Sequence, residues 1–262
     1  MSFLTFMIKN YIFNYDKYSF ICKNMQILAI IPARGGSKGI KNKNIRNFCG
    51  KPLISYAINQ ACQAKKVNRV IVSTDDHKIA AVAKKYGAEV PFLRPKELAL
   101  DNSKVVDAVL HLLEELKNKE NYQPDAIILL QTTSPMRTIN DINKALLLFT
   151  KSKADSLVSI CQTENLLLAK NSINELEILN TVFLESSNRQ ELQNVYKLDG
   201  SMIYIVKTDK FLQSKSFFTG KLVGYEIPRW RAVDLDEPQD YVIGEIFYKN
   251  FKKIQDKIKK FK

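Results

Sequence analysis

The sequence has few of the residues that form transition-metal sites or disulfide frameworks. Its 262 residues include two histidines and four widely scattered cysteines, Cys22, Cys49, Cys62 and Cys161. No two of these cysteines have the paired spacing of a zinc site, which argues against a zinc-stabilised domain and against a disulfide scaffold. Reduced thiols are the plain interpretation, so the sequence predicts a cytoplasmic protein.

A long uninterrupted apolar run is also missing, so no membrane-spanning helix is predicted. Residues 1–24 are apolar and aromatic, but Lys9, Asp16 and Lys17 interrupt them and no small-residue cleavage site follows. A signal peptide is therefore not expected. We expect residues 1–24 to be an extension, either an upstream start that is not the native one or a loosely attached segment, rather than a functional arm. One domain is predicted over residues 25–262.

Acidic residues are scarce relative to basic ones: 27 Asp and Glu stand against 40 Lys and Arg, and the formal net charge is +13. Such a balance suggests a nucleic-acid-binding protein. Part of the excess is local, because residues 249–262 contain seven lysines and one aspartate. Apolar residues in that tail recur at helical spacing, which is typical of an amphipathic helix with a solvated lysine face. No aromatic and basic RNA-binding motif is present, so nucleic acid is the less favoured partner.

The sequence does contain a regular alternation of buried strands and amphipathic helices. Apolar runs predict strands over residues 27–31, 69–74, 89–93, 126–130, 155–161 and 202–206. Helices are predicted from Pro52 onward and over residues 76–86, 103–117, 141–149 and 238–251, and Asp75 is the expected N-cap of the second helix. The alternation predicts an α/β protein with a three-layer, Rossmann-like, mostly parallel sheet and helices on both faces. Residues 162–198 break the rhythm and are predicted to be an excursion over the surface.

One stretch joins a buried strand to glycines and cations. After residues 27–31 and Pro32, the loop contains Arg34, Gly35, Gly36, Ser37, Lys38 and Gly39, and Lys41, Lys43 and Arg46 follow. Glycines let backbone N–H groups approach an anion, and a strand that leads into such a loop is where an α/β protein holds a polyphosphate. The spacing is neither GxxxxGK(S/T) nor GxGxxG, so composition alone leaves a structural turn and a phosphate cradle equally open.

The ordered string favours the phosphate cradle. Residues 31–53, IPARGGSKGIKNKNIRNFCGKPL, closely resemble the opening of the acylneuraminate cytidylyltransferases, which are CMP-sialic acid synthetases and their relatives for other nonulosonates such as legionaminate and pseudaminate. The likeness continues in family order through VSTD at 72–75, FLRP at 92–95, LQTTSPMR at 130–137, RQ at 189–190, DG at 199–200 and VDLD at 233–236. It covers about residues 26–250.

The resemblance implies a site for CTP. The residues that would bind its triphosphate are Arg34, Gly35, Gly36, Ser37, Lys38 and Lys43. Asn44 would lie near the α-phosphate, and Arg94 beside the cytosine ring. Arg34 and Lys43 are also expected to act in catalysis, by neutralising charge.

Asp234 and Asp236 match the metal-binding pair of the family. A spacing of two along an extended segment points both carboxylates to one side, and two carboxylates can hold Mg²⁺. Without the resemblance, such a pair on a surface is more often a solvated turn. The resemblance therefore implies that Asp234 and Asp236 are catalytic metal ligands for Mg²⁺, with Mn²⁺ as an alternative.

The sugar site implied by the resemblance contains Gln131, Arg189, Lys197, Asp199, Tyr204, Phe217 and Phe218. Thr132 stands where proline is usual, Lys197 where arginine is common and Asp199 where asparagine is frequent, while Phe217 and Phe218 could equally be core residues. These departures bear on which sugar is bound more than on the reaction. In the family, the excursion at 162–198 crosses to a second subunit, so the resemblance implies a homodimer in which Arg189 serves the partner's sugar site.

The reaction implied is nucleotidyl transfer. The anomeric 2-hydroxyl of a nine-carbon 2-keto sugar acid would attack the α-phosphorus of CTP and release pyrophosphate, for surface glycan synthesis. One alternative is another sugar nucleotidyltransferase, for 3-deoxy-manno-octulosonate or a hexose 1-phosphate, although the loop signatures GGxGTR and PxRxxSxRLPGKPL are absent. The other is a basic nucleic-acid-binding protein. No side chain is convincing as a general base.

Overall fold

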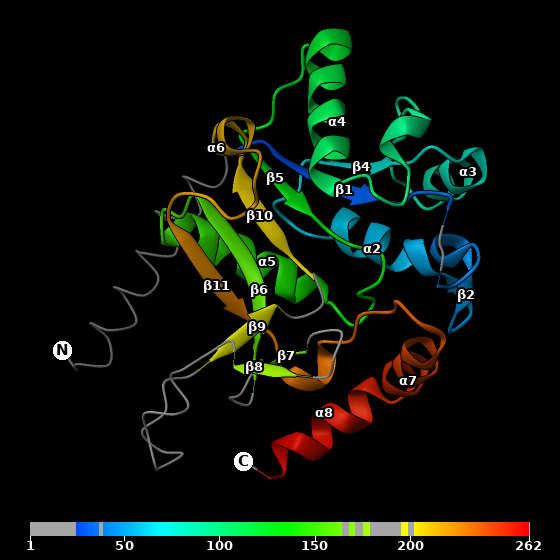
Figure 1. Cartoon of the computed structure of the whole chain (residues 1–262), viewed down its shortest axis with the longest axis vertical. Helices are drawn as coiled ribbons and strands as arrows, with labels where there is room; N and C mark the ends of the chain where they lie inside the picture. Colours follow the sequence, from blue (N-terminus) through cyan, green and yellow to red (C-terminus); the bar gives the residue numbers. More distant parts are fainter. Residues whose placement is uncertain are drawn as a thin grey trace, which may run out of the picture.

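The structure is a computed structural model that describes residues 25–36, 39–163, 168–170, 175–178, 195–198 and 202–261. Its centre is a seven-stranded sheet (Figure 1) built from β1 Ile27–Pro32, β4 Arg69–Ser73, β5 Ala126–Leu129, β6 Ser156–Gln162, β9 Tyr196–Leu198, β10 Tyr204–Lys207 and β11 Leu222–Glu226. The strand order is β11-β6-β10-β5-β1-β4, and β9 pairs with β6 off this path.

The sheet is mostly parallel, as predicted. β1 pairs in parallel with both β4 and β5, and β11 pairs in parallel with β6. β10 runs antiparallel between β5 and β6, and β9 is antiparallel to β6. The carboxyl ends of β4, β1 and β5 therefore meet at one edge of the sheet.

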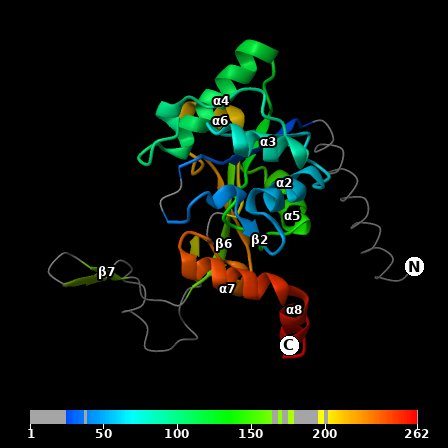
Figure 2. The same ribbon diagram turned by 90° about the vertical axis from the view of Figure 1, so that its right-hand side faces the viewer.

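Helices cover both faces of the sheet, which confirms the predicted three layers. Helices α2 Leu53–Cys62, α3 His77–Lys85 and α5 Ile139–Lys151 pack on one face, against the strand residues of alternate positions such as Ile27, Ala29 and Ile31. Helices α4 Val105–Glu120 and α6 Thr208–Ser214 pack on the other face, against Leu28 and Ile30. Figure 2 shows α4 and α6 gathered on one side of the sheet and α2 and α5 on the other.

Two local predictions are wrong. The N-cap of α3 is Asp76, whose Oδ1 accepts hydrogen bonds from the N–H groups of Lys78 and Ile79 at 2.6 and 3.0 Å, so Asp75 is free for another contact. The strand expected over 89–93 is a single bridge between Ile71 and Glu89. Pro91 follows two residues later, and because proline has no N–H it cannot continue a ladder of hydrogen bonds.

The remaining elements are short or peripheral. Strands β2 Asn47–Phe48 and β3 Lys51–Pro52 form one hairpin, and β7 Leu168–Lys170 and β8 Leu176–Ile178 form another, with β7 standing apart from the main sheet in Figure 2. Single 3₁₀ turns occur at η1 Lys43–Ile45, η2 Lys96–Leu98 and η4 Arg229–Arg231. The chain ends in α7 Pro238–Lys249 and α8 Phe251–Lys259. Among the helices described, none is both long and apolar enough to cross a bilayer.

Candidate active site

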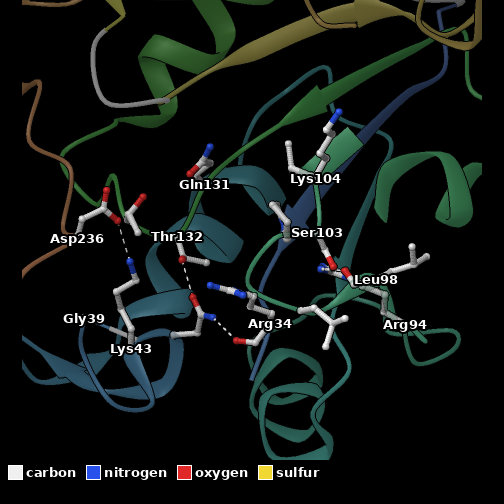
Figure 3. A pocket seen from close by; sticks show the side chains of 15 residues that line it. Arg34, Gly39, Lys43, Arg94, Leu98, Ser103, Lys104, Gln131, Thr132 and Asp236 are labelled. Atoms are coloured by element: carbon white, nitrogen blue, oxygen red, sulfur yellow. Dashed lines mark hydrogen bonds and ion pairs between the residues drawn. The ribbon is translucent and has the colours of Figure 1, made fainter. Parts of the chain in front are cut away.

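A cavity of about 360 Å³ lies beside the carboxyl ends of β4, β1 and β5 (Figure 3). Four segments that are distant in the sequence supply its walls, through Pro32, Arg34, Gly39, Lys43, Asn44, Arg94, Leu98, Leu100, Ser103, Lys104, Val105, Gln131, Thr132, Thr133 and Asp236. Ligands of open α/β sheets bind at this edge of the strands. The cavity thus brings six of the residues expected from the sequence into one place: Arg34, Lys43, Asn44, Arg94, Gln131 and Asp236.

The loop after β1 is held by its backbone. The Ala33 N–H donates to the Ser73 carbonyl at 3.0 Å, and the Gly35 N–H donates to Asp75 Oδ1 at 2.9 Å. The Gly35 N–H, expected at the triphosphate, is therefore already engaged by a carboxylate. Gly36 follows in the same loop without lining the cavity, and Ser37 and Lys38 lie outside the described residues.

Lys43 and Asp236 join the loop to the acidic segment, although 193 positions separate them in the sequence. Lys43 Nζ lies 2.9 Å from Asp236 Oδ1, as the dashed line in Figure 3 shows. The Lys43 side chain is 16% exposed and that of Asp236 66% exposed. Gly39 touches the same segment, because an added Cβ there would lie 2.5 Å from the Asp236 carbonyl oxygen. A side chain at position 39 would displace one of the two segments.

The acidic segment turns, where the sequence predicted an extended run. Leu235 is fully buried in a cluster with Phe48, Tyr56 and Tyr241, and its N–H donates to the Thr133 carbonyl at 2.9 Å. The Asp236 N–H donates to the Asp234 carbonyl at 3.1 Å, which closes a three-residue turn around Leu235. Insertion of Leu235 into the core thus bends the backbone between the two acids.

Asp234 is the more buried of the two acids and has an unsatisfied oxygen. Asp234 Oδ1 and Thr133 Oγ1 are both buried, and neither atom has a hydrogen-bond partner within the described residues. Burial raises the pKa of Asp234 to about 6; the nearby Thr133 hydroxyl opposes the rise, Asp236 adds to it and Lys43 opposes it. A buried carboxylate oxygen without a partner is costly, and a bound cation would satisfy it.

Asp234 and Asp236 are the candidate ligands for a divalent cation at this site. Within the described part of the chain, no group of three or more His, Cys, Asp or Glu residues is arranged to hold a metal. Mg²⁺ usually takes one or two carboxylates and completes its octahedral shell with water and substrate phosphates. Asp234 and Asp236 therefore fit Mg²⁺ better than a metal that requires a complete protein cage.

Arg34, which lines the cavity, forms an ion pair with Asp101. Its Nη1 lies 2.8 Å from Asp101 Oδ1, and both side chains are partly exposed. This pairing is not predictable from a sequence pattern, because Asp101 lies in the irregular segment between η2 and α4. The arginine expected to bind phosphate is thus paired with a carboxylate.

Arg94 is buried and braces one wall of the cavity. Its Nε donates to Ser73 Oγ at 3.1 Å, its Nη2 to the Ser73 carbonyl at 2.5 Å and its Nη1 to the Leu98 carbonyl at 3.4 Å. Burial lowers the pKa of Arg94, Asp75 opposes the change, and the Arg34 cation adds to it. The guanidinium therefore fixes η2 against the end of β4.

The residues expected at the sugar are less closely grouped. Gln131 follows β5 and lines the cavity, whereas Lys197 is exposed on β9. The rings of Tyr204 and Phe217 pack 5.7 Å apart, and Phe218 lies 6.1 Å from Tyr204. None of these three aromatic residues lines the cavity, and Phe217 is buried in the core. Arg189 and Asp199 lie outside the described residues.

The buried ion pair between Arg231 and Asp141 was not predicted from the sequence. Arg231 donates to Asp141 through both terminal nitrogens, at 2.6 and 2.9 Å, and Tyr225 and Thr138 also donate to the same carboxylate. The pair fixes η4, which leads directly into the acidic segment, to the start of α5. The Thr138-x-x-Asp141 spacing is a capping-box pattern and could have located this helix start.

Comparison with known proteins agrees with this geometry. A family model described as Cytidylyltransferase matches residues 28–257. The CMP-N,N'-diacetyllegionaminic acid synthase of Legionella pneumophila is 34% identical over 233 residues, which cover 84% of this chain and 95% of the relative. The pseudaminic acid cytidylyltransferase of Campylobacter jejuni strain 81-176 is 33% identical over 230 residues, covering 86% and 97%.

A solved structure shares the fold. It is a CMP:2-keto-3-deoxy-manno-octonic acid synthetase complexed with CTP, with a TM-score of 0.64, 17% sequence identity, and coverage of 86% of this chain and 99% of that one. The likeness supports the Rossmann-like architecture. With the family model matched over nearly all of the described chain and relatives similar over their full length, this protein belongs to the cytidylyltransferase family.

Proposed function

We propose that this chain is a CTP-dependent cytidylyltransferase that activates a nine-carbon 2-keto sugar acid, releasing pyrophosphate and forming a CMP-sugar for surface glycan synthesis. The observation that carries the proposal is the 2.9 Å pair between Lys43 and Asp236. It joins a cationic loop to an acidic segment inside a cavity at the nucleotide-binding edge of the sheet. The names of the two relatives, which refer to legionaminic and pseudaminic acids, favour a nonulosonate as the acceptor.

The chain's own groups would act mainly by positioning and by neutralising charge, as is usual in phosphoryl transfer. Arg34 and Lys43 would bind triphosphate oxygens, with Ser37, Lys38, Gly35 and Gly36 completing the loop. Arg34 would give up Asp101 and bind phosphate in its place. Lys43 would keep its contact with Asp236 and use another of its three N–H donors to bind a phosphate oxygen. Asn44 would contact the α-phosphate, and Arg94 would hold the wall beside the base.

Asp234 and Asp236 are proposed to hold Mg²⁺, with Mn²⁺ as an alternative. The unpartnered buried oxygen of Asp234 supports this assignment. When bound, the cation would neutralise phosphate charge and lower the pKa of the attacking hydroxyl. The acids themselves would set the position of the acidic segment relative to the loop through the Lys43 contact.

The acceptor would bind beyond Gln131, toward Tyr204, Phe217 and Phe218. We propose that the enzyme is a cytoplasmic homodimer, in which residues 162–198 carry Arg189 to the sugar site of the partner subunit. Lys197 and Asp199 are also proposed to contribute to the sugar site. A planar guanidinium suits a sugar carboxylate because it donates two parallel hydrogen bonds. The hairpin of β7 and β8, which stands apart from the main sheet, is in keeping with such an arm (Figure 2).

The test is a pyrophosphate-release assay with each of the four NTPs and a panel of acceptors, with the product identified by mass. The panel contains N-acetylneuraminate, legionaminate, pseudaminate, 3-deoxy-manno-octulosonate and a hexose 1-phosphate. We expect turnover with CTP and a nonulosonate, dependent on Mg²⁺. Turnover with only the octulosonate or only the hexose phosphate would show that the chain is a nucleotidyltransferase for that sugar and not for a nonulosonate. Salt-sensitive RNA binding without turnover of any NTP would overturn the enzyme assignment.

A further inference from the structure

A chain of hydrogen bonds runs beneath the cavity and crosses three neighbouring strand ends. Thr132 Oγ1, after β5, lies 2.6 Å from Asn44 Oδ1. Asn44 Nδ2 donates to the Arg34 carbonyl, after β1, at 2.9 Å. The next N–H along, that of Gly35, donates to Asp75, after β4, at 2.9 Å. Figure 3 shows the first two of these contacts side by side.

The network holds one peptide group at both ends. The Arg34 carbonyl and the Gly35 N–H belong to the same planar unit, so the bonds from Asn44 and to Asp75 together fix its rotation. Thr132 and Asn44 are 4% and 6% exposed. Water therefore competes little with the bond between them, and a buried hydrogen bond of this kind is strongly directional.

The partners determine which way the Asn44 amide faces. A backbone carbonyl only accepts, so the group that faces Arg34 must be the NH₂ of Asn44. The Asn44 oxygen then faces Thr132, and the Thr132 hydroxyl must donate its single proton to it. The second N–H of Asn44 makes no hydrogen bond within the described residues, and Asn44 lines the cavity. Asn44 is thus held ready to donate to an acceptor, such as a phosphate oxygen.

We propose that Thr132 is a positioning residue: its hydroxyl fixes the Asn44 amide and, through it, the Arg34–Gly35 peptide at the nucleotide site. The inference rests on the proposed function for its kinetic consequence, because Arg34 and Asn44 are the groups proposed to meet the triphosphate. It does not require Thr132 to touch substrate. The residue acts through Asn44, and loss of the hydroxyl would remove one of the two hydrogen bonds that hold the amide, leaving the bond to the Arg34 carbonyl to orient it alone.

The test compares Thr132→Val, which keeps the shape and removes the hydroxyl, with Thr132→Ser, which keeps the hydroxyl. Thr150→Val is the matched control, because Thr150 is also buried and its Oγ1 also makes one hydrogen bond, to the Leu146 carbonyl at 2.8 Å, far from the cavity in α5. We expect kcat/KM for CTP to fall about tenfold in Thr132→Val, the effect of one buried hydrogen bond. Thr132→Ser should stay within about twofold of wild type, and Thr150→Val should be unchanged although it loses similar thermal stability.

A double-mutant cycle with Asn44→Ala identifies the route of the effect. If Thr132 acts through Asn44, Thr132→Val costs nothing further once Asn44 is alanine. The proposal would be overturned if the losses of kcat/KM in the two single variants multiply in the double variant. Wild-type kcat/KM in Thr132→Val would overturn it as well.

Hydrogen exchange at the Gly35 amide gives a readout that needs no activity. We expect this amide to exchange at least about fivefold faster in Thr132→Val and at the wild-type rate in Thr132→Ser, because protection reports the stability of the local hydrogen bond. If the wild type fails to use CTP but the exchange rates differ as expected, the proposed function fails and the positioning role stands. Equal exchange in wild type and Thr132→Val would overturn the positioning role whatever the activity.

Discussion

Two aspartates of the same segment have opposite surroundings. Asp236 is mostly exposed and paired with Lys43, whereas Asp234 is half-buried beside Thr133 with one oxygen unsatisfied. An unsatisfied buried carboxylate lowers the stability of the fold, so its presence at this position is better explained by ligand binding than by folding. The two residues should therefore respond differently to substitution.

Asp234→Ala and Asp236→Ala should each leave a folded protein whose kcat is lower by on the order of 10²-fold, since each would remove a proposed ligand of the divalent cation. The melting temperature of Asp234→Ala should equal or exceed that of wild type, because the substitution removes an unsatisfied buried group. Steady-state kinetics and thermal unfolding measured on the same preparations check both parts. Normal turnover in either variant would remove the metal assignment.

Removing the Arg34–Asp101 pair should improve nucleotide binding, whereas the two substitutions above should reduce activity. Because both side chains are partly exposed, the pair is worth little, and Asp101→Asn should lower KM for CTP only about threefold while kcat stays unchanged. Asp209→Asn in α6 changes the net charge equally at a distance and is the control. A higher KM in Asp101→Asn would mean that Asp101 assists nucleotide binding instead of competing with it.

At the scale of elements, the buried pair of Asp141 and Arg231 attaches the approach to the acidic segment to α5. Burial alone would raise the pKa of Asp141, but hydrogen bonds and charge from Arg231, with help from Thr138, outweigh it and hold the pKa below its usual range. The ionised form of Asp141 is therefore favoured in the folded state. The stabilisation exists only while Asp141 is ionised.

Asp141→Asn should lower the free energy of unfolding at pH 7 by about 3 kcal/mol, because it leaves the Arg231 charge buried without its counterion. The folded pKa is depressed, so the difference from wild type should be complete above the unfolded value of about 3.9 and should shrink as pH falls below it. Urea unfolding of both proteins at several pH values between 3 and 7 measures the difference. A difference in the free energy of unfolding that grows as the pH falls would contradict this prediction.

The helices and strands of the main domain could be predicted from periodicity because they bury one face or both. The direction of β10 could not, since a buried apolar run such as residues 202–206 looks the same in a parallel and an antiparallel strand. Asp75 and Asp76 are adjacent identical residues, so the sequence does not show which of them is the N-cap of α3. Asp75 is not the cap, and its carboxylate instead accepts a hydrogen bond from the N–H of Gly35, 40 positions away. Local signals do not report such distant partners.

At the scale of the molecule, the proposed sugar site requires a second chain. Arg189 lies outside the described residues, and the described cavity is the part of the site proposed to bind the nucleotide. Complementation between two inactive variants tests whether Arg189 acts in the partner subunit. An oligomer is expected first, with a mass by light scattering of twice the 30.1 kDa chain.

Arg189→Ala and Asp236→Ala should each be nearly inactive, but unfolding and refolding them together should restore about one quarter of wild-type activity. Random pairing makes half of the dimers mixed, and one of the two sites in each mixed dimer then has both residues intact. Refolded mixtures of Asp234→Ala and Asp236→Ala, whose lesions fall in the same site, are the control and should stay inactive. No recovery in the first mixture would place Arg189 in its own chain's site or outside any site.

The site was predictable to the extent that its residues carry family motifs. Arg34, Lys43, Asn44, Gln131 and Asp236 all line the cavity. What the sequence could not supply was the set of contacts among them, such as the Thr132–Asn44 bond or the Arg34–Asp101 pair. Those contacts depend on the register of β5 against β1 and on the path of the segment before α4, and neither is encoded in a local pattern.

The absence of room between Gly39 and the Asp236 carbonyl has a mechanical consequence. With 2.5 Å available to an added carbon atom, the two backbones already touch, so neither can advance toward the other. Because the two backbones are already in contact, we expect any movement of Gly39 toward the acidic segment to move that segment with it.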